Sequence, residues 1–160
     1  MLRFGLSVAI IVLILDQATK WYVLEWVMQP PRIIEVTGFF NIVMVWNPGI
    51  SFGFLGGGTS EWQPWLLSAF GTIVAGGLLV WMYVAGLGRL ASLGVGLIVG
   101  GALGNVIDRL RYGAVFDFLD IHAWGWHWPA FNVADAAITV GVVALIVDAV
   151  LNERREKRIN

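Results

Sequence analysis

Two aspartates, Asp117 and Asp135, stand beside apolar sequence, and their carboxyl groups could act together as an acid and a base. Asp117 lies between apolar neighbours in residues 115–118, and Asp135 ends the segment 131–135 at the start of an apolar stretch. Two carboxylates brought close cannot both ionise cheaply, so such a pair shares one proton. One member then deprotonates a water while the other protonates the departing group. Spacing alone also fits a turn-capping loop residue at Asp117 and a helix N-terminal charge at Asp135.

Other polar residues recur at helical spacing inside apolar sequence. Asn105 stands three residues before Asp108 and four before Arg109, so all three share one helix face. An asparagine one turn inside lipid needs a partner, which predicts a polar network rather than a plain helix end. Asp16 and Lys20 are four apart and can pair. Ionisable groups within a span usually face the protein interior, so this pair is either a structural ion pair or a substrate contact.

A rival nucleophile lies in residues 49–53, which match the pattern G-x-S-x-G around Ser51. That pattern can mark a serine on a strand-to-helix elbow, with His122 or His127 as its base. The chain has 20 glycines, so a chance match is easy, and the α/β setting of the elbow is absent. A third reading is a small proton-coupled carrier, suggested by acids within the spans. The lack of a visible inverted repeat argues against the carrier.

The composition of the chain and its apolar stretches indicate the fold class that positions these residues. The chain of 160 residues is 58% hydrophobic and only 13% charged, about half the usual charged share of a soluble domain. Four apolar stretches each approach the roughly 20 residues that cross a bilayer as a helix: 2–24, 65–85, 90–107 and 133–151. We therefore expect an integral membrane all-α fold with four transmembrane helices, forming a single membrane domain over 1–160. The first stretch lacks a small-residue cleavage site and is predicted to stay as an uncleaved span.

Lysine and arginine predict the orientation. Six of the ten basic residues fall on one side of the predicted spans, which indicates the cytoplasm: Arg3, Arg89, Arg154, Arg155, Lys157 and Arg158. Both termini are then cytoplasmic, and segments 25–64 and 108–132 are periplasmic. Residues 32–37 and 39–46 are rich in β-branched and aromatic side chains, which predicts a small periplasmic sheet between helices 1 and 2. A cluster at Trp124, Trp126 and Trp128 suits the lipid headgroup level.

Several classes of site are excluded or disfavoured. The absence of cysteine excludes a thiol nucleophile and thiolate metal sites. A net charge of −1 without a basic face argues against nucleic acid as a partner. Glycines recur at 96, 100 and 104, with Gly94 and Gly101 beside them. We interpret these as a stripe for close helix packing rather than a dinucleotide loop, since no strand precedes them.

Five motifs in chain order resemble the lipoprotein signal peptidase family, also called signal peptidase II. They are residues 16–20, 47–52, 100–109, 115–118 and 131–135, and the resemblance covers nearly the whole chain. It implies an aspartic endopeptidase of the bacterial inner membrane that needs no metal or organic cofactor. Such an enzyme removes the signal peptide of a prolipoprotein, just before a cysteine that carries diacylglycerol, with water activated between two aspartates.

The same resemblance implies roles for individual residues and partners. Asp117 and Asp135 match the catalytic pair. Positions that line or support the site are matched by Asp16, Lys20, Asn47, Gly49, Asn105, Asp108, Arg109, Asn132 and Ala134. Ser51 then belongs to a structural motif and is not a nucleophile. The partners implied are lipid-modified prolipoproteins and membrane lipid, and we expect the chain to act as a monomer.

Overall fold

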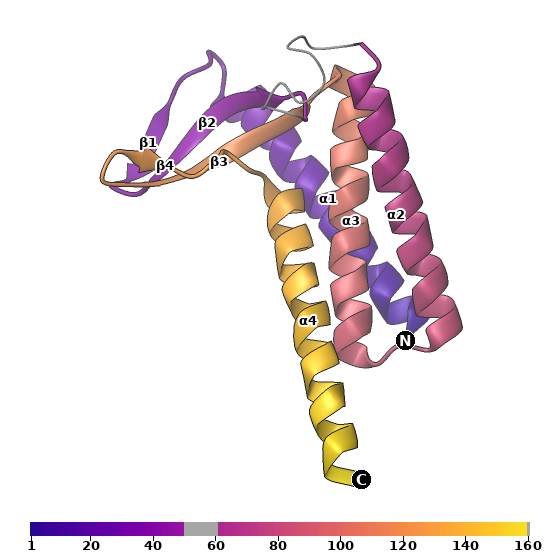
Figure 1. Cartoon of the computed structure of the whole chain (residues 1–160). Helices are drawn as coiled ribbons and strands as arrows, with labels where there is room; N and C mark the ends of the chain where they lie inside the picture. The colour runs from indigo at the N-terminus through magenta and orange to yellow at the C-terminus, as the bar shows by residue number, and fades with distance from the viewer. Residues whose placement is uncertain (50–60, 160) are drawn as a thin grey trace.

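Four long helices dominate the computed structural model, which describes residues 1–49 and 61–159 (Figure 1). They are α1 (Leu2–Tyr22), α2 (Gln63–Ala85), α3 (Arg89–Tyr112) and α4 (Val133–Ile159), and α1 continues into a π-helical turn, η1 (Val23–Val27). All four are long and apolar enough to cross a membrane. The predicted fold class, a four-helix membrane protein with a small sheet, is confirmed.

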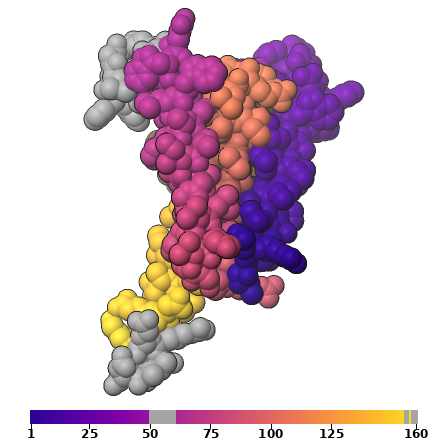
Figure 2. All heavy atoms as spheres, turned by 90° about the vertical axis from the view of Figure 1, so that its right-hand side faces the viewer, coloured from indigo at the N-terminus to yellow at the C-terminus, as the bar shows by residue number. Residues whose placement is uncertain are grey.

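Glycine gives α3 its central place in the bundle, because α3 packs against each of the other three helices. In the space-filling view, α3 is visible only as a strip between α2 and α1 (Figure 2). A methyl group on Gly100 would lie 2.5 Å from the carbonyl oxygen of Ala9 in α1. On the opposite face, a methyl group on Gly94 would lie 2.8 Å from the carbonyl oxygen of Gly141 in α4. The predicted packing stripe is confirmed, and it serves two neighbouring helices.

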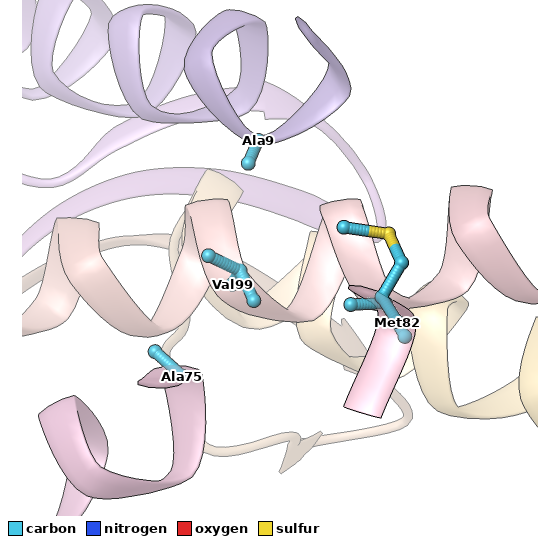
Figure 3. Close-up of a cluster of buried hydrophobic side chains, with 5 residues drawn as sticks. Ala9, Ala75, Met82 and Val99 are labelled. Atoms are coloured by element: carbon cyan, nitrogen blue, oxygen red, sulfur yellow. The ribbon is translucent and has the colours of Figure 1, made fainter. Parts of the chain in front are cut away.

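A small apolar core fills the space where α1, α2 and α3 meet. Figure 3 shows Ala9 of α1 pointing toward Val99 of α3, with Ala75 and Met82 coming from α2. Most large apolar side chains instead point outward, such as Phe70 on α2. An outer surface of this kind is stable only against lipid, since water would leave so much apolar area hydrated.

The sheet has four antiparallel strands in the order β1 (Ile34–Thr37), β2 (Phe40–Asn47), β3 (Val115–Ala123) and β4 (Trp126–His127). The sequence predicted the first two strands, whereas β3 and β4 come from the second outer segment. Residues 115–118 are all buried, so β3 lacks the alternating pattern that marks a half-exposed strand. Phe116 and Phe118 anchor the sheet on an apolar cluster with Val23 and Met28.

The two ends of the bundle differ. Both termini and the α2–α3 turn lie at one end, while the sheet extends sideways from the other end, where α4 begins (Figure 1). Helix α3 continues to Tyr112, past the predicted end at residue 107, so Asp108 and Arg109 are inside the helix. The polar residues singled out in the sequence therefore gather at the sheet end of the bundle.

Candidate active site

Asp117 is held on the central part of the sheet, in strand β3. Its neighbours Phe116 and Phe118 belong to the apolar cluster, and side chains alternate along a strand, so the carboxylate points away from that cluster. Its Oδ2 accepts a hydrogen bond from Asn47 Nδ2 at 3.0 Å. The residue is 1% exposed. Burial raises the pKa of Asp117 to about 6, and the negative charge of Asp135 adds to the rise, against the hydrogen bonds from Asn47 and Asn132.

Asp135 is fixed by the first turn of α4. Asn132 precedes the helix, and its Oδ1 accepts the backbone N–H of Asp135 at 3.0 Å. In return, Asp135 Oδ2 accepts the backbone N–H of Asn132 at 3.2 Å, which completes a reciprocal cap. The other carboxylate oxygen accepts Asn105 Nδ2 at 2.8 Å. Both oxygens of Asp135 are thus held, and the helix N-terminus favours its negative charge.

Asn132 links the two carboxylates. Its side-chain Nδ2 donates to Asp117 Oδ1 at 2.7 Å, while its backbone N–H and Oδ1 hold Asp135. The structure therefore brings together the two aspartates that the sequence singled out, and it does so through one fully buried asparagine. Two acids in this arrangement can share one proton and act on a water between them.

A second buried network lies below the pair, inside the bundle. Lys20 Nζ contacts Asp16 Oδ2 at 2.9 Å and Asp108 Oδ2 at 2.8 Å. Asp16 Oδ1 also accepts the backbone N–H of Ala134 at 2.9 Å, one of the N–H groups that the first turn of α4 leaves without a helical partner. Asp108 Oδ2 accepts the backbone N–H of Phe116 at 3.2 Å, beside Asp117. This network ties α1 and α3 to both segments that carry the aspartates.

Gln17 completes this network and was not among the predicted site residues. Its Nε2 lies 3.0 Å from Asp108 Oδ1, and 3.2 Å from Asp16 Oδ2 and from the Gly104 carbonyl oxygen. An amide next to Asp16 inside an apolar span was the available sequence signal, because a polar group there needs partners.

The turn after β2 aims Asn47 at Asp117. The backbone N–H of Gly49 donates to Asn47 Oδ1 at 2.9 Å, so the Nδ2 of the same amide is left to face the carboxylate. Gly49 has a φ of +107°, a conformation that other residues rarely adopt. A Cβ at Gly49 would also collide with Leu67 of α2. The backbone conformation therefore requires the glycine, while the Leu67 side chain could move aside.

Arg109 supplies positive charge beside the pair. Its guanidinium interacts electrostatically with Asp135, Asp117 and Asp108. Nη1 reaches the Asn105 carbonyl oxygen at 3.4 Å, and Nε is buried without a hydrogen-bond partner in the part of the chain that the structure describes. The side chain has donors to spare, so it can bind an oxygen of a ligand.

Two clefts reach this region. One, of about 600 Å³, is lined by Asp135 together with apolar and aromatic side chains that include Trp126 and Val140. The other, of about 290 Å³, lies between α2, α3 and α4, with Asn105 and Arg109 in an otherwise mostly apolar wall. A ligand with apolar groups and a central polar bond suits this layout.

The two histidines of the rival serine hypothesis lie away from the aspartates. Ser51 is outside the described residues. His122 stacks on His127 with ring centroids 4.9 Å apart, and His127 Nδ1 lies 2.9 Å from Asp120 Oδ1. His122 is five residues beyond Asp117 on β3, which corresponds to roughly 16 Å along an extended strand. The histidines thus belong to a separate cluster on the outer part of the sheet, in which Asn41 Nδ2 also donates to Asp120 Oδ2 at 2.9 Å.

Comparisons with known proteins give one consistent family. A family model described as signal peptidase (SPase) II matches residues 8–151. The chain is 49% identical over 146 residues to a lipoprotein signal peptidase of Burkholderia thailandensis, with 89% of this chain and 85% of the relative covered. It is 47% identical over 155 residues to a lipoprotein signal peptidase of Methylobacterium sp. (strain 4-46), covering 96% and 93%.

Solved structures agree with this result. One, described as a bacterial membrane enzyme, matches with a TM-score of 0.79 and 30% sequence identity, covering 96% of this chain and 90% of the other. A second structure with the same description has a TM-score of 0.77 and 30% identity, covering 89% and 90%.

Proposed function

The chain belongs to the signal peptidase II family and is a peptidase that removes signal peptides from lipoproteins, and we propose that Asp117 and Asp135 are its catalytic pair. The observation that carries this proposal is Asn132, whose backbone and side chain hold one carboxylate each within hydrogen-bond distance. An aspartic mechanism is implied by the family, and this is the carboxylate pair that the polar network surrounds.

The geometry supports hydrolysis without a covalent intermediate. One carboxylate takes a proton from a water as the water oxygen bonds to the scissile carbonyl carbon. The other carboxylate protonates the carbonyl oxygen, so that a neutral tetrahedral diol forms. When the diol collapses, the C–N bond breaks and the leaving nitrogen takes up the proton that came from the water. One hydroxyl of the diol returns a proton to the carboxylate that had protonated the carbonyl oxygen, so a carboxylic acid is released. Atoms and charges balance with water as the single co-reactant.

The surrounding residues have supporting roles in this proposal. Asn47, Gly49, Asn105 and Asn132 orient the carboxylates, and Arg109 offers donors to carbonyl oxygens of the bound substrate. Asp16, Lys20 and Asp108 hold the helices that carry the pair. Ala134 lies where α4 packs closely on α3, since a Cβ built on Gly101 would collide with its carbonyl oxygen. A metal or organic cofactor takes no part in these steps.

The proposed place of the enzyme is the inner membrane, with both termini in the cytoplasm and the site near the periplasmic face. Arg3, Arg89 and the basic tail support this orientation, because Arg3 follows the N-terminus, Arg89 begins α3 and the tail ends α4, and these ends of the helices lie opposite the sheet (Figure 1). The exposed side chains of Trp124, Trp126 and Trp128 at the sheet end suit the headgroup layer. The single chain contributes every residue of the proposed site, which fits a monomer.

The substrate is proposed to be a prolipoprotein whose cysteine carries diacylglycerol. The apolar linings of the two clefts support a lipidated ligand that enters sideways from the bilayer. Purified protein in proteoliposomes should therefore cleave a diacylglyceryl-modified prolipoprotein and leave the same chain without the lipid largely uncut. Equal cleavage of both forms would contradict lipid recognition, and no cleavage of either form would contradict the peptidase assignment.

A further inference from the structure

A single buried amide connects the lysine of α1 with the proposed catalytic pair. Asn105 Oδ1 accepts hydrogen bonds from Lys20 Nζ at 3.1 Å and from Asn132 Nδ2 at 3.2 Å. Its Nδ2 donates to Asp135 Oδ1 at 2.8 Å. Lys20 is 5% exposed and Asn105 is 6% exposed, so water does not replace these contacts readily.

The positive charge of Lys20 decides which way this amide faces. An ammonium group only donates hydrogen bonds, so it must meet the oxygen of Asn105. If the amide turned over, its NH₂ would face the Lys20 ammonium and the Asn132 NH₂, and its oxygen would face the Asp135 carboxylate. Each of these contacts is repulsive in a setting of low dielectric. The N–H of Asn105 is therefore directed at Asp135 by Lys20 together with Asn132, and Lys20 is the charged member of these two donors.

Lys20 makes one hydrogen bond in addition to its two salt bridges. Its three N–H groups meet three acceptors, namely Asp16, Asp108 and Asn105. One carboxylate would already neutralise the ammonium and two are present, while the third contact reaches toward the site. Lys20 is thus both part of an ion cluster and the partner that orients Asn105.

The other charged groups around the pair do not single out one carboxylate. Arg109 on α3 acts on both Asp135 and Asp117, and Asp16 and Asp108 are occupied by Lys20 and backbone N–H groups. Asn132 donates to each carboxylate. Each carboxylate also has one amide donor of its own, Asn47 for Asp117 and Asn105 for Asp135, and such a donor favours the ionised form. The Asn105 donor is the one that contacts a buried ammonium, so the two carboxylates differ in what orients their donors and in burial. Asp117 is buried, whereas Asp135 lines the larger of the two clefts.

We infer that Lys20 is a positioning residue that acts through Asn105 to keep Asp135 the ionised member of the pair, with Asp117 holding the proton. This inference rests on the proposed function. Asp135 is then the base that takes the proton from water, and Asp117 is the acid that protonates the scissile carbonyl oxygen. As the diol collapses, Asp135 gives its proton to the leaving nitrogen and Asp117 regains its own from a hydroxyl.

The test is a mutant cycle followed by pH profiles of kcat. Lys20→Met alone leaves Asp16 and Asp108 buried without a cation, so it is combined with Asp16→Asn and Asp108→Asn, which leaves no unpaired buried charge in the cluster. This triple variant, Asn105→Ala and the combined variant are compared with wild type. Lys157→Met, on the exposed tail, is the matched control at the other lysine of the chain.

We expect the triple variant to lower kcat by about 10- to 100-fold, the range of one hydrogen bond to a charged group, with little change in KM. The acid limb of its kcat profile should move to higher pH, because Asp135 binds its proton more tightly without a fixed donor. Asn105→Ala should lower kcat and move the acid limb in the same way. Adding it to the triple variant should lower kcat little further. Lys157→Met should match wild type.

Two results would overturn the inference. One is an acid limb that stays in place while kcat and thermal stability fall together, as a purely structural lysine would give. The other is a combined variant whose loss is the product of the separate losses, since Lys20 would then act independently of Asn105. Asp117→Asn and Asp135→Asn measured alongside separate the two claims: if they stay active, the proposed function itself fails.

Discussion

Asparagine in place of Asp117 or Asp135 is expected to lower kcat for signal-peptide cleavage by about a thousand-fold or more, within the range that acid–base groups contribute. An asparagine amide cannot take a proton from water or give one to the carbonyl oxygen. The side chain keeps its size, so the helices and the sheet should stay assembled. The measurement is single-turnover cleavage of a lipid-modified prolipoprotein, with thermal unfolding of each variant recorded beside it.

Asp148→Asn is the matched control for this loss. Asp148 lies on the same helix as Asp135 but several turns further along, where Oδ2 accepts Asn152 Nδ2 at 2.9 Å. This variant should cleave at the wild-type rate. Ser51→Ala should also keep its activity, and a fluorophosphonate should not label the protein. A near-normal rate in either dyad variant would show that the pair is wrongly assigned, and loss of cleavage in Ser51→Ala would restore the serine reading.

Gly100→Ala is expected to give a large loss of stability. The new Cβ would lie 2.5 Å from the Ala9 carbonyl oxygen and 2.8 Å from Val12 Cβ, so α1 and α3 must separate. Overpacking of this kind typically costs about 1–3 kcal/mol, and more where backbone atoms are involved. We expect the melting temperature in detergent to fall by about 3–10 °C. Cleavage should fall as well, since Lys20 on α1 would move away from Asn105 on α3.

Gly77→Ala is the paired control for that experiment. Gly77 lies in α2, another spanning helix, and a Cβ there meets nothing within 4 Å among the described residues. Alanine forms helix more readily than glycine, so this variant should be as stable as wild type or slightly more stable. If Gly100→Ala and Gly77→Ala unfold at the same temperature, the close contact between α1 and α3 does not hold the bundle together.

The sequence predicted well what depends on local spacing. Apolar length predicted the helices, and the three- and four-residue spacing from Asn105 predicted which side chains share a face of α3. The glycine repeat predicted close packing, because a period of four follows one side of a helix. For each of these features, the cause and its effect lie within a few turns of one helix.

Contacts between distant segments were not predictable in this way. Asn132 and Asp117 meet because a strand and a helix start converge, and no periodic pattern marks that meeting. The same holds for Lys20 and Asn105, which lie on different helices. Strand β3 was missed because it is buried on both faces and carries Asp117 in an apolar run. The resemblance to a family singled out the right side chains, but the hydrogen bonds that orient them come only from the structure.

The pH dependence of kcat/KM tests most directly the central claim that two aspartates share one proton. Burial, with the charge of Asp135, raises the pKa of Asp117 to about 6, and the acid must keep its proton to act. We therefore expect kcat/KM to fall as the pH rises through about 6. Asn47→Ala removes a donor to Asp117 and should move the alkaline limb to higher pH. A rate that rises with pH to a plateau, with no alkaline decline and no effect of Asn47→Ala on the profile, would contradict the account.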